Sequence, residues 1–205
     1  MKAFLNEISK GEQQLKQCDL NLDYLISNGA PFDWPAFKKR PLESLVHAII
    51  SQQLSVKSAS AIRKRVHALL PAGENFTPEN ISAINDEDLR AAGLSQAKVR
   101  TVNAITEFSL NEDNDFYALH NHTDKHIKDQ LCSIKGVGPW TADIFLMFGL
   151  QRFDVFASGD LGLRKAIRLL YQLDELPSPQ QCDVYSKKWQ PYRTIAAWHL
   201  WRTVD

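Results

Sequence analysis

The sequence predicts an all-α fold, and the spacing of its apolar residues is the main reason. Apolar residues recur three or four positions apart along most of the chain, as at Leu42, Leu45, Val46 and Ile49, which is the spacing of one face of a helix. No convincing run alternates apolar and polar residues over the length of a strand, so no β-sheet is expected. The 205 residues suffice for one sizeable core, or for two small lobes that share a cleft.

Composition narrows the classes of protein and of partner. The 44% hydrophobic and 23% charged residues are typical of a globular protein. No apolar run approaches the length of a membrane span, and the first residues carry charge too early for a secretory signal, so we expect an intracellular protein. The formal net charge of +0 counts against a DNA-binding protein without excluding one, because the 24 Lys and Arg can be unevenly placed. The 3 cysteines are too widely spaced for a disulfide framework or an iron–sulfur cluster.

Helix-ending and helix-starting residues divide the first half of the chain. Asn28 and Gly29 end the first helix, Gly93 ends a later one, and Ser95 is expected to be the N-cap of the helix that follows it. A polar junction interrupts the apolar pattern between two of the helices, at residues 51–55. The helices expected before Ser95 are residues 1–30, 42–53, 56–70 and 81–94.

The centre of the chain, residues 126–150, predicts two helices joined by a tight hairpin. Apolar residues from 127 to 134 share one helical face, Gly136 and Gly138 then supply backbone shapes that a side chain would forbid, and Pro139 suits the first position of a second helix. The uncapped N–H groups at the start of that helix favour an anion such as phosphate. For the two glycines alone, an ordinary helical hairpin is the better explanation.

Asp160 lies where an N-cap belongs, before an amphipathic helix that carries Leu163, Ile167 and Leu170 on one face. Spacing alone favours a capping role for Asp160 over a catalytic one. The two roles are compatible, because the N-terminus of a helix stabilises negative charge.

Two consecutive motifs resemble those of a known family. Residues 134–142 (IKGVGPWTA) resemble the hairpin of helix-hairpin-helix DNA glycosylases, and residues 154–164 (DVFASGDLGLR) resemble the segment that bears their catalytic aspartate. Together they resemble the alkylation-repair branch, 3-methyladenine DNA glycosylase II. The resemblance implies a two-lobed helix-hairpin-helix fold with the active site in the cleft between the lobes. Lobe one would span about residues 41–119, and lobe two about residues 1–40 and 120–205, with the hairpin in lobe two.

The resemblance also implies a catalytic residue and a base pocket. Asp160 would be catalytic, because a fixed carboxylate stabilises a deoxyribose that becomes cationic as its bond to the base breaks. Whether Asp160 also activates water as a general base stays open. Trp140 and Trp201 match the pocket aromatics, with Ile144 and Leu161 beside them, although core packing is an alternative for each tryptophan. An alkylated purine is cationic and is attracted to aromatic faces.

Contacts with DNA are implied at two places. Gln53, with Leu54 as its neighbour, matches the wedge that enters the base stack when the target base leaves it. The implied contacts with the DNA backbone are Gly136, Gly138, Lys135 and Thr141. The backbone carbonyls that match a monovalent cation site in the family are those of Cys132, Ile134 and Val137. The resemblance therefore implies no required cofactor, and at most a Na⁺ or K⁺ ion at the hairpin.

Position 140 bears on the reaction type. Relatives that cut the DNA strand through a Schiff base carry lysine where this chain has Trp140, so the resemblance implies a monofunctional hydrolase. Its substrates would be 3-methyladenine and 7-methylguanine in double-stranded DNA. We expect a monomer with no membrane partner, which would be cytoplasmic and nucleoid-associated in a bacterium or nuclear in a eukaryote.

Two alternative functions remain, a non-catalytic helix-hairpin-helix DNA-binding module and a glycosylase for oxidised or mismatched bases. Ala157 stands where a proline is common in this family. Ile144, Leu161 and Gly162 stand where well-known bacterial relatives carry bulkier or aromatic pocket groups, so the breadth of substrates stays open.

Polar residues outside these motifs have ordinary explanations. Lys98 is expected to be solvated. His120, His122 and His126 lie close together in the sequence, but a zinc site needs a closed set of ligands. Thr123 as the N-cap of the next helix explains that segment more simply.

Overall fold

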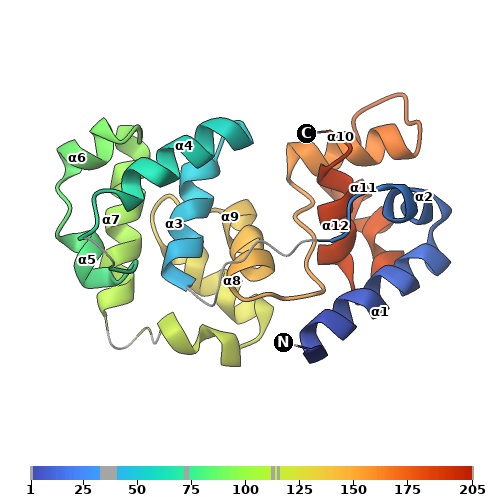
Figure 1. Cartoon of the computed structure of the whole chain (residues 1–205), viewed down its shortest axis with the longest axis horizontal. Coiled ribbons are helices and arrows are strands. Elements are labelled where there is room, and N and C mark those ends of the chain that lie inside the picture. The colour runs from blue at the N-terminus through green and yellow to red at the C-terminus, as the bar shows by residue number, and fades with distance from the viewer. Residues whose placement is uncertain (1, 33–40, 72–73, 112–113, 115, 205) are drawn as a thin grey trace. The chain divides into compact units, whose positions relative to one another are not determined.

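The computed structural model describes residues 2–32, 41–71, 74–111, 114 and 116–204 (Figure 1). Every regular element in these ranges is a helix, which confirms the predicted all-α class. None of the described helices combines the length and the apolar character that a membrane span needs. The chain forms two compact units, one of residues 36–150 and one of residues 1–35 with 151–205.

The unit of residues 36–150 is built around α3 (Pro41–Ser51). Residues 42–50 of this helix are all buried, as expected of a helix that is surrounded on every side. It packs against α4, α7, α9 and η3. The other elements of this unit are α4 (Val56–His67), α5 (Pro78–Ser82), α6 (Asp86–Ala91), α7 (Gln96–Leu110), η2 (Phe116–Asn121), α8 (Asp124–Ser133), α9 (Pro139–Ile144) and η3 (Phe145–Gly149).

The unit of residues 1–35 and 151–205 is built around α12 (Arg193–Trp201), which packs against α1, α2 and α10. Trp189 is fully buried here, and its indole N–H donates to a carboxylate oxygen of Asp19 at 2.8 Å. The other elements of this unit are α1 (Lys2–Cys18), α2 (Leu20–Asn28), α10 (Leu161–Leu170), α11 (Pro179–Ser186) and η4 (Lys187–Trp189).

Helix boundaries confirm the expected caps and correct two of the expected helices. Ser95, Thr123 and Asp160 are the N-caps of α7, α8 and α10, as predicted. The single helix expected at residues 1–30 is wrong, because Asp19 accepts from a backbone N–H as the N-cap of a second helix. Residues 81–94 are also not one helix, because Asn85 caps α6 and separates it from α5.

The contacts divide the chain at different places from the expected lobes. The sequence placed the hairpin, residues 126–150, with both ends of the chain. In the structure α9 and η3 bury their apolar residues against α3, and the hairpin therefore belongs to the unit of residues 36–150.

Candidate active site

Asp160 stands at the start of α10, the most strongly amphipathic helix of its unit. Its side-chain oxygen Oδ1 accepts the backbone N–H of Leu163 at 2.8 Å, which is the hydrogen bond of an N-cap. The residue is half-buried, so its carboxylate is neither sealed in the core nor fully solvated. The N-terminus of a helix carries partial positive charge, which attracts a carboxylate.

Trp201 meets this carboxylate from the end of α12. Its indole Nε1–H donates to the same oxygen, Oδ1 of Asp160, at 2.8 Å, and its ring is also half-buried. A hydrogen bond to a carboxylate is stronger than one between neutral groups. One carboxylate oxygen is thus held by two N–H donors, a backbone amide and an indole, and this fixes the plane in which the carboxylate lies.

Gly162 provides the space for this arrangement. A Cβ atom at this position would lie 3.0 Å from Oδ1 of Asp160 and 3.1 Å from Cδ1 of Trp201. Both distances are shorter than an ordinary contact between non-bonded atoms, which is about 3.5–4.0 Å for carbon. Leu161, which lies between Asp160 and Gly162 in the chain, is 51% exposed. Asp160, Leu161 and Trp201, which the sequence assigned to one site, therefore lie together in this unit.

The segment that leads to Asp160 is held against α12 by a series of hydrogen bonds. Thr194 donates its backbone N–H to the carbonyl of Phe153 at 2.9 Å, and its hydroxyl accepts the N–H of Val155 at 3.2 Å. Arg193 Nε donates to Oδ1 of Asp154 at 2.6 Å. Ala157, which stands where a proline is common in the family, is completely buried. These bonds hold the segment in place without the proline.

The hairpin between α8 and α9 lies in the other unit, and its two glycines differ. Gly136 has a φ of 92°, and a Cβ there would overlap the hydroxyl of Thr101, so this position requires glycine. Gly138 has an ordinary φ of −107°, and a Cβ there would meet no atom within 4 Å. The expectation that both glycines supply unusual backbone shapes is therefore wrong for Gly138. Its bare Cα leaves the start of α9 open, where no side chain caps the N–H groups.

The other residues assigned to the hairpin differ in their exposure to solvent. Lys135 is exposed, whereas Thr141 is only 1% exposed and its hydroxyl accepts from Gln52 Nε2 at 2.9 Å. Any contact between Thr141 and a phosphate would therefore have to use its backbone. Trp140 and Ile144 lie one turn apart on α9, and both are half-buried.

The turn between α3 and α4 carries the expected wedge residues. Gln53 is exposed, with a φ of 58°, and Leu54 is 40% exposed. The ammonium group of Lys98 anchors this turn by donating to the carbonyls of Ile50 and Gln52 at 2.9 and 2.8 Å. Because Lys98 is half-buried and makes both hydrogen bonds, the expectation that it is solvated is wrong. Burial also lowers the pKa of Lys98. Sequence reasoning missed this anchor, because Lys98 and the turn lie far apart in the chain.

The backbone that could hold a monovalent cation follows the end of α8. Cys132 lies in the last turn, where carbonyls have no partner within the helix, and Ile134 and Val137 follow it. The carbonyl of Ile134 accepts the N–H of Val137 at 3.0 Å, which leaves one of its two lone pairs for an ion. The donors are all oxygen atoms, as a hard cation prefers.

A family model described as "HhH-GPD superfamily base excision DNA repair protein" matches residues 46–191. This range covers the turn between α3 and α4, the hairpin and Asp160. The chain belongs to the HhH-GPD superfamily. Sequence comparison agrees, since DNA-3-methyladenine glycosylase 1 of Schizosaccharomyces pombe is 34% identical over 209 residues, which cover 98% of this chain and 90% of that protein. A Bacillus subtilis protein named as a DNA-3-methyladenine glycosylase, YfjP, is also 34% identical, over 78% of this chain and 58% of its own length.

Solved structures extend this agreement to the fold. The 3-methyladenine DNA glycosylase Mag1 of Schizosaccharomyces pombe, in complex with abasic DNA, superposes with a TM-score of 0.85 and 32% identity, over 95% of this chain and 96% of Mag1. The DNA-3-methyladenine glycosidase of Bacillus halodurans gives a TM-score of 0.74 and 36% identity, over 93% of this chain and 86% of that one. The expected helix-hairpin-helix glycosylase fold is therefore confirmed for this HhH-GPD protein.

Proposed function

We propose that this HhH-GPD protein is a DNA-3-methyladenine glycosylase that releases alkylated purines from double-stranded DNA in base excision repair. The observation that carries the proposal is the half-buried carboxylate of Asp160, held on one oxygen by the start of α10 and by the indole of Trp201. The names of the relatives support the same substrate class.

The reaction breaks the bond between C1′ of deoxyribose and the purine nitrogen. Methylation gives the purine a positive charge, so the base leaves as a neutral molecule and needs little help from an acid. Positive charge then develops on the sugar, and the carboxylate of Asp160 stabilises it more than it stabilises the uncleaved nucleotide. Water adds to C1′ and loses a proton, which leaves an abasic site in an intact strand.

Trp201 has two roles in this proposal. Its N–H edge orients the carboxylate of Asp160, and its ring face attracts the cationic purine, an interaction of roughly 0.5–2 kcal/mol. Leu161, exposed beside Asp160, supplies apolar contact. The assignment of Trp140 and Ile144 to the base pocket stays a prediction, which single substitutions at those positions can test.

The contacts with DNA follow from the exposed parts of the other unit. We assign the wedge to Gln53 and Leu54, whose turn is anchored by Lys98 and capped at the start of α4. The base must leave the duplex, which costs a few kcal/mol, and a side chain in the vacated stack offsets part of that cost. A backbone phosphate would bind at the hairpin, through the N–H groups near Gly136 and Gly138 and the ammonium of Lys135.

A Na⁺ or K⁺ ion held by the carbonyls of Cys132, Ile134 and Val137 would strengthen that phosphate contact by adding positive charge at the hairpin. Hydrolysis itself requires no cofactor in this proposal, because the leaving group is already cationic. A protein with this substrate would work where the DNA is, at the nucleoid of a bacterium or in the nucleus of a eukaryote, and we expect it to act as a monomer.

The decisive experiment compares the wild type with Asp160→Asn on methylated, oxidised and mismatched duplexes. Asparagine is as good an N-cap as aspartate, so the variant keeps α10 and loses only the charge. We expect the wild type to release 3-methyladenine and 7-methylguanine, and the variant to bind the same duplex with base release slowed by about 10²–10³-fold. A non-catalytic DNA-binding module would release no base in either form. A glycosylase for oxidised or mismatched bases would act on the other two duplexes.

Strand cleavage is tested separately with borohydride, which traps a Schiff base between a lysine and the abasic sugar. With tryptophan at position 140, we expect no trapped adduct and an intact abasic strand. A covalent complex formed through a native lysine would contradict the monofunctional assignment.

A further inference from the structure

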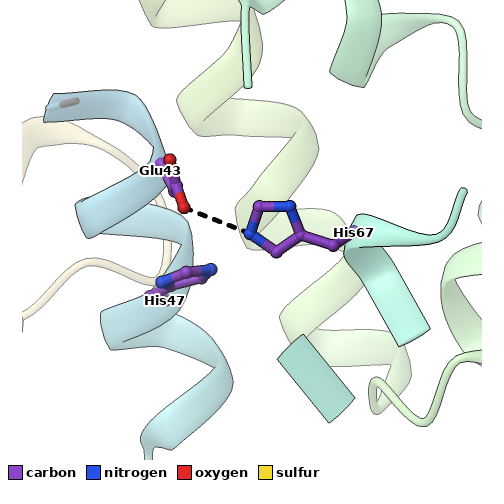
Figure 2. Close-up of side chains that lie close together, drawn as sticks. All are labelled: Glu43, His47 and His67. Carbon is purple, nitrogen blue, oxygen red and sulfur yellow. Dashed lines mark hydrogen bonds and ion pairs between the residues drawn. The ribbon is translucent and has the colours of Figure 1, made fainter. Parts of the chain in front are cut away.

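Two helices of the unit of residues 36–150 direct three possible metal ligands into one space. Glu43 and His47 lie one turn apart on α3, and His67 is the last residue of α4 (Figure 2). One carboxylate oxygen and one ring nitrogen from each histidine all lie within 4.8 Å of one another. We propose that Glu43, His47 and His67 bind a divalent transition-metal ion, and that Zn²⁺ fits this site best.

The spacing of the three donors is close to that of a zinc site. With bonds of about 2.0–2.2 Å, two ligands of a tetrahedral zinc ion lie roughly 3.4 Å apart. Nε2 of His67 and Oε1 of Glu43 are 3.1 Å apart, slightly closer than that separation, so an ion would replace their direct contact. The remaining donors lie up to 4.8 Å apart, so binding an ion would require the histidine rings to turn toward it.

The ligand types also suit zinc. Two imidazoles and one carboxylate form a known set of three protein ligands, in which the fourth position is taken by water. His47 is buried on α3 and offers one ring nitrogen to the same space as the other two donors. The His67 side chain is 38% exposed, which gives an ion a way into the site.

The surroundings favour a site with rigid ligands and only moderate affinity for the ion. The ring of Phe76 packs edge-on against His47 and His67, with ring centroids 5.6 and 4.5 Å away, and closes one side. The guanidinium of Arg63 opposes a cation, and the carboxylate of Glu43 offsets it. We therefore expect weaker binding than at a site with four protein ligands.

The consequence of binding would be mechanical rather than catalytic. The ligands join α3 to the far end of α4, and the turn between these helices carries Gln53 and Leu54. Asp160 lies in the other unit and is not a ligand. A bound ion would therefore stiffen the helix pair and raise the thermal stability of the protein.

The test uses the full chain after treatment with a chelator and dialysis. Titration with a zinc salt, followed by calorimetry, should show one ion per chain with a Kd in the micromolar range or below, and a higher Tm. His67→Gln and Glu43→Gln should each weaken binding at least tenfold. The matched control is His126→Gln, because His126 is exposed on α8 and outside the cluster, and it should bind as the wild type does.

Equal zinc binding by His67→Gln and His126→Gln would overturn the proposal, because the ion would then be held elsewhere on the surface. Absence of stoichiometric binding to the wild type would also overturn it, and would leave Glu43 and His67 as an ion pair only. Circular dichroism shows whether the variants fold. If His67→Gln does not fold, Co²⁺ bound to the wild type decides: visible bands of a tetrahedral complex support the site, and the spectrum of the hydrated ion alone rejects it.

Discussion

Gly162→Ala is the substitution that most directly tests how Asp160 is positioned. The added Cβ would lie 3.0 Å from Oδ1 of Asp160 and 3.3 Å from Nε1 of Trp201, the two atoms that share the hydrogen bond. At least one of them must move by a few tenths of an ångström. A displacement of 1 Å in an active site can cost about 10²-fold in rate, so we expect a loss of roughly tenfold, which corresponds to about 1.4 kcal/mol in the barrier.

The matched control is Gly159→Ala, three residues earlier, where a Cβ meets no atom within 4 Å. Single-turnover release of 7-methylguanine from a methylated duplex measures the rate for both variants. Thermal unfolding should change little for Gly162→Ala, because alanine favours a helix over glycine by about 1 kcal/mol and this offsets the crowding. If the two variants release the base equally fast, the contact between Asp160 and Trp201 does not set the rate, and the proposed role of Trp201 is wrong.

Three further predictions concern the other unit. Gly136→Ala should lower the free energy of unfolding by more than about 1 kcal/mol, because the backbone there has a positive φ and Thr101 occupies the space that a Cβ would need. Its control, Gly138→Ala, should leave urea unfolding unchanged and weaken DNA binding. Lys98→Met removes two hydrogen bonds to carbonyls and should cost about 1–3 kcal/mol in urea unfolding, and a smaller loss would show that the ammonium is not an anchor. The pKa of His47 falls from about 6.5 in the unfolded chain to about 3 in the fold. The unfolded chain therefore binds a proton that the folded protein does not, and the free energy of unfolding falls by up to about 1.4 kcal/mol per pH unit as the pH drops from about 6.5 toward about 3. With a chelator present, His47→Gln should flatten the dependence of unfolding on pH by this amount and His122→Gln should not.

Local features of the fold could be predicted from the sequence with good accuracy. The caps at Ser95, Thr123 and Asp160 were expected and are confirmed, because an N-cap depends on only the next three residues. The helices at residues 1–30 and 81–94 were each predicted too long. Asp19 and Asn85 cap new helices within these segments, and the apolar spacing continues across both breaks.

The site shows the same division between local and distant information. The sequence placed Asp160 at a helix start and, by resemblance, named Trp201 as a pocket residue, but it could not show that the indole donates to the carboxylate. The two residues are 41 positions apart, and only the packing of α12 against α10 brings them together. The role of Gly162 follows from that contact, so it too was inaccessible from spacing.

The metal ligands proposed here had no sequence signal, whereas the histidines that did attract attention form no such group in the part of the chain that the structure describes. Glu43 and His47 are polar residues within a largely apolar helical segment, and His67 lies 20 residues after His47.

The sequence by itself determined the helical class, the capped starts of the helices and the two motifs of the family, because each depends on residues that are neighbours in the chain. Only the tertiary structure decided which side chains meet, because the burial of apolar faces brings distant helices into contact and their polar side chains then find partners. The indole of Trp201 against Asp160, the anchor of Lys98 and the cluster of Glu43, His47 and His67 all arise in this way.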